Sequence, residues 1–329
     1  MYSSVVHVFV GLVLNSINFL VLRSKNLTQA TYTFLLGLAL ADFMSLLMFG
    51  LNSLFRGHFL REPITTHFEV YAYIPVGSTS TTASILLIVV VTCERHVALT
   101  HPIIARTRCT PVNARMLVTL VWLASCVINL PRWFVFDVDA SGALVRTQFG
   151  ASRLYAVLAW AYFIVLTVGC SASLVVLNSL LIRGLRRASA KRRLLATRDR
   201  RTDDVRLTRM LVAVVVIFLA GELPSAIFSR FIVAAIARRR SAPVLQEDWY
   251  AVCACVATVC VVTQHSLNFL CYCAFNKRFR EELARKFCGT TGALGVVSGT
   301  NGAREDYAKE SHLHEHSIHD TAIPLQTLQ

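Results

Sequence analysis

The chain has 329 residues, of which 55% are hydrophobic and only 16% are charged, and its formal net charge is +14. A soluble protein carries about a quarter charged residues, so this composition excludes an ordinary soluble globular domain. The positive charge does not indicate a nucleic-acid partner, because the basic residues form short patches between apolar blocks and no nucleic-acid-binding motif is present. The apolar blocks are too long for strands, so an all-α membrane protein is predicted.

Seven apolar blocks have the length of a membrane-spanning helix, which is about 20 residues. We expect spans at residues 5–22, 32–54, 70–93, 115–136, 154–182, 210–236 and 249–273. Lys and Arg concentrate in the loops after the first, third and fifth spans and just after the seventh. The positive-inside rule therefore predicts an outer N-terminus and a cytoplasmic C-terminus. The sequence thus predicts a seven-transmembrane helix bundle over residues 1–275.

Two further segments follow the last span. Residues 276–288 place Phe279, Leu283 and Phe287 at i, i+4 and i+8, which predicts a short amphipathic helix lying in the membrane interface. Cys288 ends this helix and is a candidate for a palmitoyl anchor. Residues 289–329 are polar and rich in Gly, Ser and Thr, so a disordered cytoplasmic tail is predicted there.

Polar residues inside the spans are the most informative, because hydrocarbon makes them costly to retain. In chain order they and their neighbours are Asn15, Leu38–Asp42, Glu94-Arg95-His96, Trp122, Phe218, Pro224 and Asn268–Tyr272. This order resembles the rhodopsin-like G-protein-coupled receptors over roughly residues 10–288. The segments LRSKNLTQATYTFLLGLALAD, CERHVALTHP and LNSLLIRGLRR look most like invertebrate neuropeptide receptors of the FMRFamide-receptor type.

Arg95 lies beside Glu94 at the cytoplasmic end of the third span, where their ion pair can hold the helix bundle shut. Asp203 and Asp204, at the start of the sixth span, are expected as a second partner. The resemblance implies that activation moves the sixth helix outward and frees Arg95 to face a heterotrimeric G protein. The alternative is a plain surface ion pair, worth about 0–1 kcal/mol. The remaining residues that the resemblance assigns to this coupling region are His96, Asn268 and Tyr272.

The sixth span carries a proline, Pro224, which lacks an N–H group and is expected to kink the helix. Together with Ile85 and Phe218 it resembles the transmission core of the family. Glu222 stands where the family mostly has Trp, so it joins this group as a departure from the pattern.

Asp42 is the acid in the middle of the second span, and the resemblance makes it the floor of a sodium-ion pocket. The other members of that pocket are Ser80, Ser84 and Asn268. His265 takes a place near Asn268 that usually holds a small polar residue. Our hypothesis is that His265, close to two acids, partly replaces the sodium ion and makes signalling sensitive to pH. The alternative is that Glu222 is neutral or turned into the ligand cavity.

The outer side of the chain departs from the family. Residues 68–71 and 137–152 contain no cysteine, so the usual disulfide between the third span and the second outer loop is not expected. The seventh span has no lysine for a retinal Schiff base, and Gly77 stands where an amine receptor has an acid. Arginines with aromatic residues suit an acidic or carbonyl-rich ligand such as a peptide, although they also suit lipid phosphates at the outer rim. The candidate ligand-binding residues are Tyr73, Gly77, Arg132, Trp133 and Arg230.

The sequence therefore predicts a receptor in the plasma membrane that binds an extracellular peptide, contacts membrane lipid, signals to a heterotrimeric G protein and catalyses no reaction. Two alternatives remain open at this point. One is a divergent receptor fold that no longer signals. The other is a seven-helix transporter or membrane enzyme, although a transporter would favour broken helices or repeat symmetry, and neither is visible.

Overall fold

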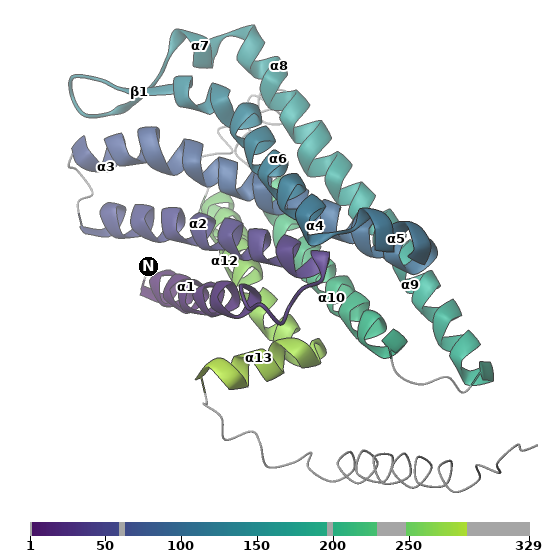
Figure 1. Ribbon diagram of the computed structural model, residues 1–329. Helices are drawn as coiled ribbons and strands as arrows, with labels where there is room; N and C mark the ends of the chain where they lie inside the picture. The colour runs from purple at the N-terminus through teal and green to yellow at the C-terminus, as the bar shows by residue number, and fades with distance from the viewer. Residues whose placement is uncertain (1, 59–62, 196–199, 229–247, 288–329) are drawn as a thin grey trace, which may run out of the picture. The chain divides into compact units, whose positions relative to one another are not determined.

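The structure is a computed structural model that describes residues 2–58, 63–195, 200–228 and 248–287. These parts of the chain are almost entirely helical (Figure 1). The long helices are α1 (Tyr2–Leu22), α2 (Ala30–His58), α4 (Ile74–Thr100), α6 (Pro111–Asn129), α9 (Cys170–Leu195), α10 (Arg200–Ile227) and α12 (Asp248–Phe275). The shorter ones are α3 (Pro63–Phe68), α5 (Pro102–Arg108), α7 (Gln148–Ala151), α8 (Arg153–Tyr162) and α13 (Lys277–Phe287).

Six helical stretches in the described residues are long and apolar enough to cross a membrane. They are Ala30–Gly57, Pro63–Thr100, Pro111–Phe134, Arg153–Arg187, Val205–Ile227 and Cys255–Phe275. The N-terminal helix adds a shorter apolar stretch, Val6–Leu22. These seven correspond to the seven predicted spans, so the predicted all-α bundle is confirmed.

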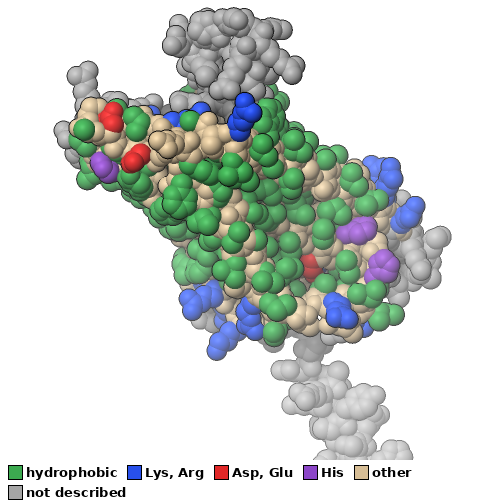
Figure 2. All heavy atoms as spheres, turned by 90° about the horizontal axis from the view of Figure 1, so that it is seen from above, with side chains coloured by type: hydrophobic (Ala, Val, Ile, Leu, Met, Phe, Trp, Pro, Cys, Tyr) green, Lys and Arg blue, Asp and Glu red, His purple; other side chains and the backbone are tan. Residues whose placement is uncertain are grey.

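Apolar side chains cover much of the outer surface of the bundle. On α6 five exposed apolar residues recur every three or four positions, which places them on one outward-facing stripe. They are Val112, Met116, Leu120, Leu123 and Val127. Figure 2 shows a face dominated by hydrophobic side chains, with Lys and Arg gathered toward its margins. A soluble protein rarely exposes such a large apolar area, whereas hydrocarbon covers it without cost.

Neighbouring helices pack closely along the bundle. α1 packs against α2 and α12, α2 against α4 and α6, and α10 against α12 (Figure 1). A Cβ added at Gly11 would collide with the Ser266 hydroxyl, so α1 approaches α12 closely because residue 11 is glycine. Large apolar side chains such as Leu38, Leu87 and Met210 are fully buried.

Two of the spans differ from their prediction in length and regularity. The third was expected at 70–93, but the chain is helical from Pro63 to Thr100 and includes a π-helical turn, η1 (Glu69–Tyr73). The fifth is helical from Arg153 to Leu195 and includes a second one, η3 (Phe163–Gly169). No proline occurs in this stretch, and Cys170 follows the wide turn directly. Wide turns of this kind are frequent near functional sites.

A β-hairpin follows α6, which ends in the 3₁₀ turn η2 (Leu130–Phe134). Strands β1 (Phe136–Val138) and β2 (Leu144–Arg146) are antiparallel, with Phe136 opposite Arg146. Gly142 has a φ of 79°, and its N–H donates to the Asp139 carbonyl at 2.9 Å to close the turn. No pattern in the sequence predicted this hairpin.

Candidate functional site

Asp42 lies at the centre of a polar cluster that joins three helices. Its side chain is fully buried in α2. Its Oδ1 accepts a hydrogen bond from Ser84 Oγ at 2.9 Å and lies 2.7 Å from His265 Nδ1. Its Oδ2 accepts from Asn268 Nδ2 at 2.7 Å. Because Ser84 belongs to α4 and the other two residues to α12, this single carboxylate ties α2, α4 and α12 together.

The first helix reaches the same cluster through its buried asparagine. Asn15 Nδ2 donates to the backbone carbonyl of His265 at 2.9 Å and to the Gly11 carbonyl at 3.0 Å. This contact fixes the backbone of α12 at the residue whose ring meets Asp42. The position of His265 is therefore set both by its own side chain and by α1.

The histidine ring has a second nitrogen that remains unused. His265 Nε2 is buried and has no hydrogen-bond partner among the described residues. Glu222, half-buried on α10, interacts electrostatically with His265 but makes no hydrogen bond or ion pair with a described residue. An ionised Asp42 in a low-dielectric interior needs a counter-charge, and the imidazole is the group placed to supply it. The structure thus places His265 directly against Asp42 and within electrostatic range of Glu222, the two acids that the sequence singled out.

Three side chains already contact the Asp42 carboxylate, the group that the sodium-ion pocket was expected to use. Both carboxylate oxygens are already engaged by side-chain donors, and the His265 ring occupies the adjacent space. Ser80 is buried, but its hydroxyl donates to the Val76 carbonyl of its own helix at 3.0 Å. Within the described residues, no group of three His, Cys, Asp or Glu side chains could hold a metal ion.

Glu94 and Arg95 form a buried ion pair at the end of α4. Arg95 Nε donates to Glu94 Oε2 at 2.6 Å, and Arg95 Nη2 pairs with Glu94 Oε1. Thr31 Oγ1, at the start of α2, donates to the same carboxylate at 3.0 Å. The pair is therefore neutralised internally and held to a second helix, unlike a solvated surface pair.

The other predicted members of the coupling region are less well connected. Asp203 and Asp204 fall in the first turns of α10, but their side chains lie outside the described residues. His96 Nδ1 is buried without a partner in the described part of the chain. Tyr272 is buried with its ring against Phe279, the ring centroids being 5.5 Å apart, and its hydroxyl is likewise without a described partner.

The start of α13 is fixed to the loop after α1 by contacts that sequence reasoning missed. Glu282 is buried and accepts hydrogen bonds from Ser24 Oγ at 2.7 Å and from Asn26 Nδ2 at 2.6 Å. Tyr32 and Asn276 meet side chain to side chain at 3.3 Å. The sequence predicts an exposed amphipathic helix for this segment, and nothing in that pattern indicates that Glu282 is buried and bound to another loop.

The predicted transmission core is divided between two helices. Ile85 on α4 and Phe218 on α10 are both buried. Pro224 lies inside α10, which continues through it to Ile227.

Arg132 is held in place by a polar network that involves α4, the end of α6 and α8. Its Nε donates to Asn129 Oδ1 at 2.9 Å, and its guanidinium carbon lies 4.6 Å from the Tyr162 ring centroid. Asn129 Nδ2 donates to Thr82 Oγ1 at 2.9 Å, which in turn meets the Tyr162 hydroxyl at 3.0 Å. The Nη groups of Arg132 make no hydrogen bond to a described residue. Thr82 and Tyr162 were not predicted, although both are polar residues within spans.

The other candidate ligand residues do not converge on Arg132. Trp133, the next residue, is exposed, whereas Arg132 is half-buried. A Cβ added to Gly77 would lie 3.9 Å from the nearest ring atoms of Tyr73, so these two residues are neighbours. Arg230 lies outside the described residues.

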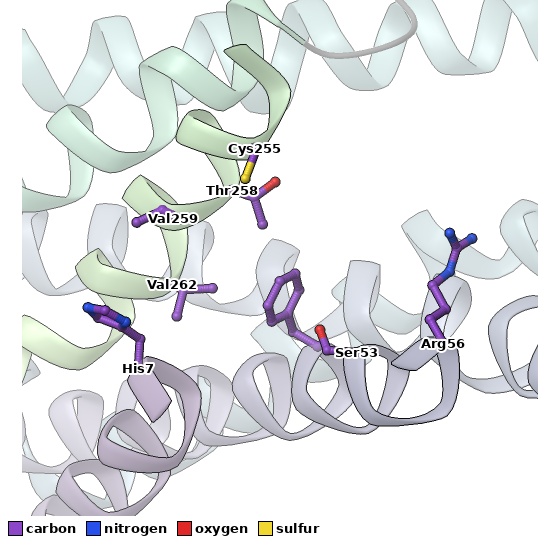
Figure 3. Close-up of a pocket in the computed structure, with 8 residues that line it drawn as sticks. His7, Ser53, Arg56, Cys255, Thr258, Val259 and Val262 are labelled. Atoms are coloured by element: carbon purple, nitrogen blue, oxygen red, sulfur yellow. The ribbon is translucent and has the colours of Figure 1, made fainter. Parts of the chain in front are cut away.

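A cavity of about 260 Å³ opens between α1, α2 and α12. Its lining is Phe49, Val259, Val262, Cys255, Thr258, Ser53, His7 and Arg56. Figure 3 shows His7 and Arg56 at opposite ends, with Ser53 and Val262 between them. Arg56 is paired with Glu69, the Nη2–Oε2 distance being 2.5 Å, so its charge is compensated.

The hairpin is held to the N-terminal part of the third span without a disulfide. Tyr71, in η1, donates its hydroxyl hydrogen to Asp137 Oδ1 at 2.5 Å. The Tyr71 hydrogen bond and the Val138 N–H lower the pKa of the Asp137 carboxyl below its ordinary value. The carboxylate therefore remains charged, and the link intact, throughout the neutral range.

Replacing Tyr71 with Phe is expected to loosen the hairpin. Amide hydrogen exchange of residues 136–146 should accelerate about two- to five-fold, the modest range usual for an exposed charged contact. Since the pKa of Asp137 is lowered, the link contributes above the usual carboxyl pKa of about 3.9 and is lost only as the pH falls below it. Tyr155→Phe, whose ring keeps its packing on Phe149, is the control. Equal exchange rates in the two variants would contradict the assignment.

Known proteins of the same pattern match most of this chain. The profile described as 7 transmembrane receptor (rhodopsin family) matches residues 16–276. Sex peptide receptor-related protein 2 of Caenorhabditis elegans is 27% identical over 228 residues, 61% of this chain and 50% of that protein. The FMRFamide receptor of Drosophila melanogaster is 28% identical over 299 residues, 82% of this chain and 50% of that protein.

A third relative, the sex peptide receptor of Drosophila melanogaster, is 25% identical over 313 residues, 85% of this chain and 70% of that protein. The chain thus spans about half the length of the first two relatives. The family match covers well over half of the chain and includes Asp42, Ser84, His265 and Asn268. It also agrees with the apolar helices, so the protein is a multi-pass membrane protein. The chain belongs to the rhodopsin family of seven-transmembrane receptors.

Proposed function

We propose that this chain is a neuropeptide receptor of the plasma membrane that passes peptide binding to a heterotrimeric G protein, without catalysing a reaction. The observation that carries the proposal is the buried Glu94–Arg95 pair at the end of α4, held to α2 by Thr31. A charged pair kept from water at this end of the bundle can be opened by a partner that supplies new contacts to the arginine. Opening is coupled to outward movement of the sixth helix, α10.

Arg132 supports a peptide as the ligand. Its guanidinium is oriented by Asn129 and Tyr162, and its Nη groups remain available for an acidic or carbonyl group. The names of the relatives point the same way, since they include receptors for FMRFamide and for sex peptide. The Nη end of the Arg132 guanidinium is thus the group that we expect to meet the ligand.

The distribution of basic residues supports an N-terminus outside the cell. Arg106 and Arg108 on α5 and the arginines at the end of α9 lie in the loops that the positive-inside rule assigns to the cytoplasm. The same rule places the Glu94–Arg95 pair on the G-protein side. The family match favours a receptor over the transporter and the membrane enzyme.

The experiment compares the parent chain with Arg95→Ala in cells exposed to a panel of amidated neuropeptides, with G-protein activation as the readout. A peptide response is expected in the parent and is lost in Arg95→Ala at equal surface expression. Arg106→Ala removes an exposed arginine from α5 nearby and should respond as the parent does. A parent chain that reaches the surface and answers no peptide would instead favour the divergent receptor that no longer signals.

A further inference from the structure

The outward-facing stripe of α10 changes character along its length. Val216, Leu223 and Ile227 are exposed at steps of seven and four residues, which places them on one side of the helix. Arg209, seven residues before Val216, continues the same stripe, and Arg206 lies one turn further along it. The surface that hydrocarbon covers therefore ends in two guanidinium groups at the start of α10.

The neighbouring wall, at the end of α12, changes in the same way. Leu270 and Phe275 are exposed apolar residues, and exposed basic side chains follow them, among them Lys277 and, one turn on, Arg280. Arg280 Nη1 donates to the carbonyls of Cys273 at 2.8 Å and Ala274 at 3.2 Å, which fixes its guanidinium beside the helix end. The exposed side chains thus change from apolar to basic both at the start of α10 and at the end of α12.

The N-terminus of α13 adds to the positive potential at this place. Asn276 caps the helix, because its Oδ1 accepts from the Phe279 N–H at 3.1 Å. The N-terminal end of an α-helix carries a partial positive charge and favours an anion.

A pocket of about 430 Å³ lies between these elements, and we name it the basic pocket. Its lining is Arg206, Arg209, Lys277, Arg280, Ala274 and Phe275. No acidic side chain is among these lining residues. Lys277 has a loose, exposed contact with Glu281 at 3.5 Å, which compensates little of its charge. Four cations are therefore gathered around one space that an anion can fill.

We propose that the basic pocket binds the polyphosphorylated headgroup of an anionic membrane lipid. Several negative charges on one group match the four cations, and oxygen atoms of phosphate accept from guanidinium forks. The exposed apolar side chains of α10 and α12 lie beside the pocket, where the acyl chains of the lipid pack. A soluble phosphate compound would leave this apolar wall unused.

The membrane orientation proposed above places the basic pocket on the cytoplasmic leaflet, where anionic lipids concentrate. Its arginines lie on the outward stripe of α10 rather than with the buried Arg95, which favours lipid over a protein partner. A bound headgroup connects the start of α10 to the junction of α12 and α13.

The test uses the full chain reconstituted in phosphatidylcholine nanodiscs, with binding of a fluorescent phosphatidylinositol bisphosphate as the readout. The double variant Arg206→Gln/Arg209→Gln is expected to bind about twenty-five-fold more weakly, since each basic residue at an anionic surface contributes roughly a five-fold factor. Arg106→Gln/Arg108→Gln, which removes the same charge from exposed positions on α5, should change binding by less than about two-fold.

Three outcomes would overturn the proposal. Equal losses in the two double variants would mean a diffuse attraction to basic loops rather than a site. Inositol polyphosphate without acyl chains competing as tightly as the lipid would identify a soluble phosphate as the occupant. Parent chain that binds the bisphosphate lipid no better than phosphatidylserine would show that the pocket does not select a polyphosphorylated headgroup.

Discussion

Replacing His265 with Asn is expected to lower the free energy of unfolding by about 3–5 kcal/mol, the usual cost of removing one partner from a buried ion pair. The imidazole lies 2.7 Å from the fully buried Asp42 carboxylate, and no Lys or Arg side chain is among the hydrogen-bond partners of that carboxylate. Asn268 and Ser84 donate hydrogen bonds to the carboxylate but carry no charge to offset it. The variant would therefore leave Asp42 uncompensated inside the bundle.

A double-mutant cycle isolates this contact. Asp42→Asn and Asp42→Asn/His265→Asn complete it, and thermal stability of each purified protein in detergent is the measurement. Neutralising both partners should recover most of the loss, because neither charge is then stranded. Losses that simply add would contradict a coupled pair.

The pH profile of signalling provides a second readout. The hypothesis that signalling is sensitive to pH involves Asp42, Glu222 and His265 together. It requires the pH profile of signalling to flatten in His265→Asn.

Replacing Glu94 with Gln is expected to raise basal G-protein activation about ten-fold. The buried Arg95 would lose both of its carboxylate contacts, a loss of about 3–5 kcal/mol in an unrelaxed site. If about 1.4 kcal/mol of this lost free energy had stabilised the resting state but not the signalling state, the population of the signalling state rises ten-fold. Activation measured without peptide, at matched surface expression, checks the value.

Glu281→Gln is the matched control for that experiment. It also removes a glutamate from an ion pair at this end of the bundle, but Lys277 and Glu281 are both exposed and 3.5 Å apart. An exposed pair of this kind is worth about 0–1 kcal/mol, so basal activity should stay near that of the parent. Basal activity that is unchanged in both variants would mean that Glu94 does not restrain Arg95.

The convergence around Asp42 was expected from the family resemblance, and the spacing of residues along one helix agrees with it. His265 and Asn268 are three residues apart and therefore share a face of α12, which meets α2 where Asp42 lies. Ser80 shows what such reasoning cannot supply. It lies one turn before Ser84, but a serine in a helix can bond either a neighbour or the carbonyl four residues back, and Ser80 does the latter.

The surroundings of Arg132 and of the β-hairpin were less predictable for a related reason. Arg132 and Trp133 are adjacent in sequence, yet the 3₁₀ turn η2 gives them different surroundings, one bound to Asn129 and one exposed. The Tyr71–Asp137 hydrogen bond joins two segments that are 66 residues apart, so neither segment alone indicates it. Contacts of this kind depend on packing that only the folded chain defines.

The π-helical turn η3 has a consequence for comparing this receptor with its relatives. A π turn accommodates about one residue more than an α turn, so it acts as a one-residue insertion that the helix absorbs without a loop. A relative whose corresponding helix is regular has one residue fewer between Arg153 and Leu195. Aligned without a gap at Phe163–Gly169, every position on one side of this turn is then displaced by one residue, a rotation of about 100° around the helix. Equivalent residues on the two sides of η3 must therefore be counted from different reference points.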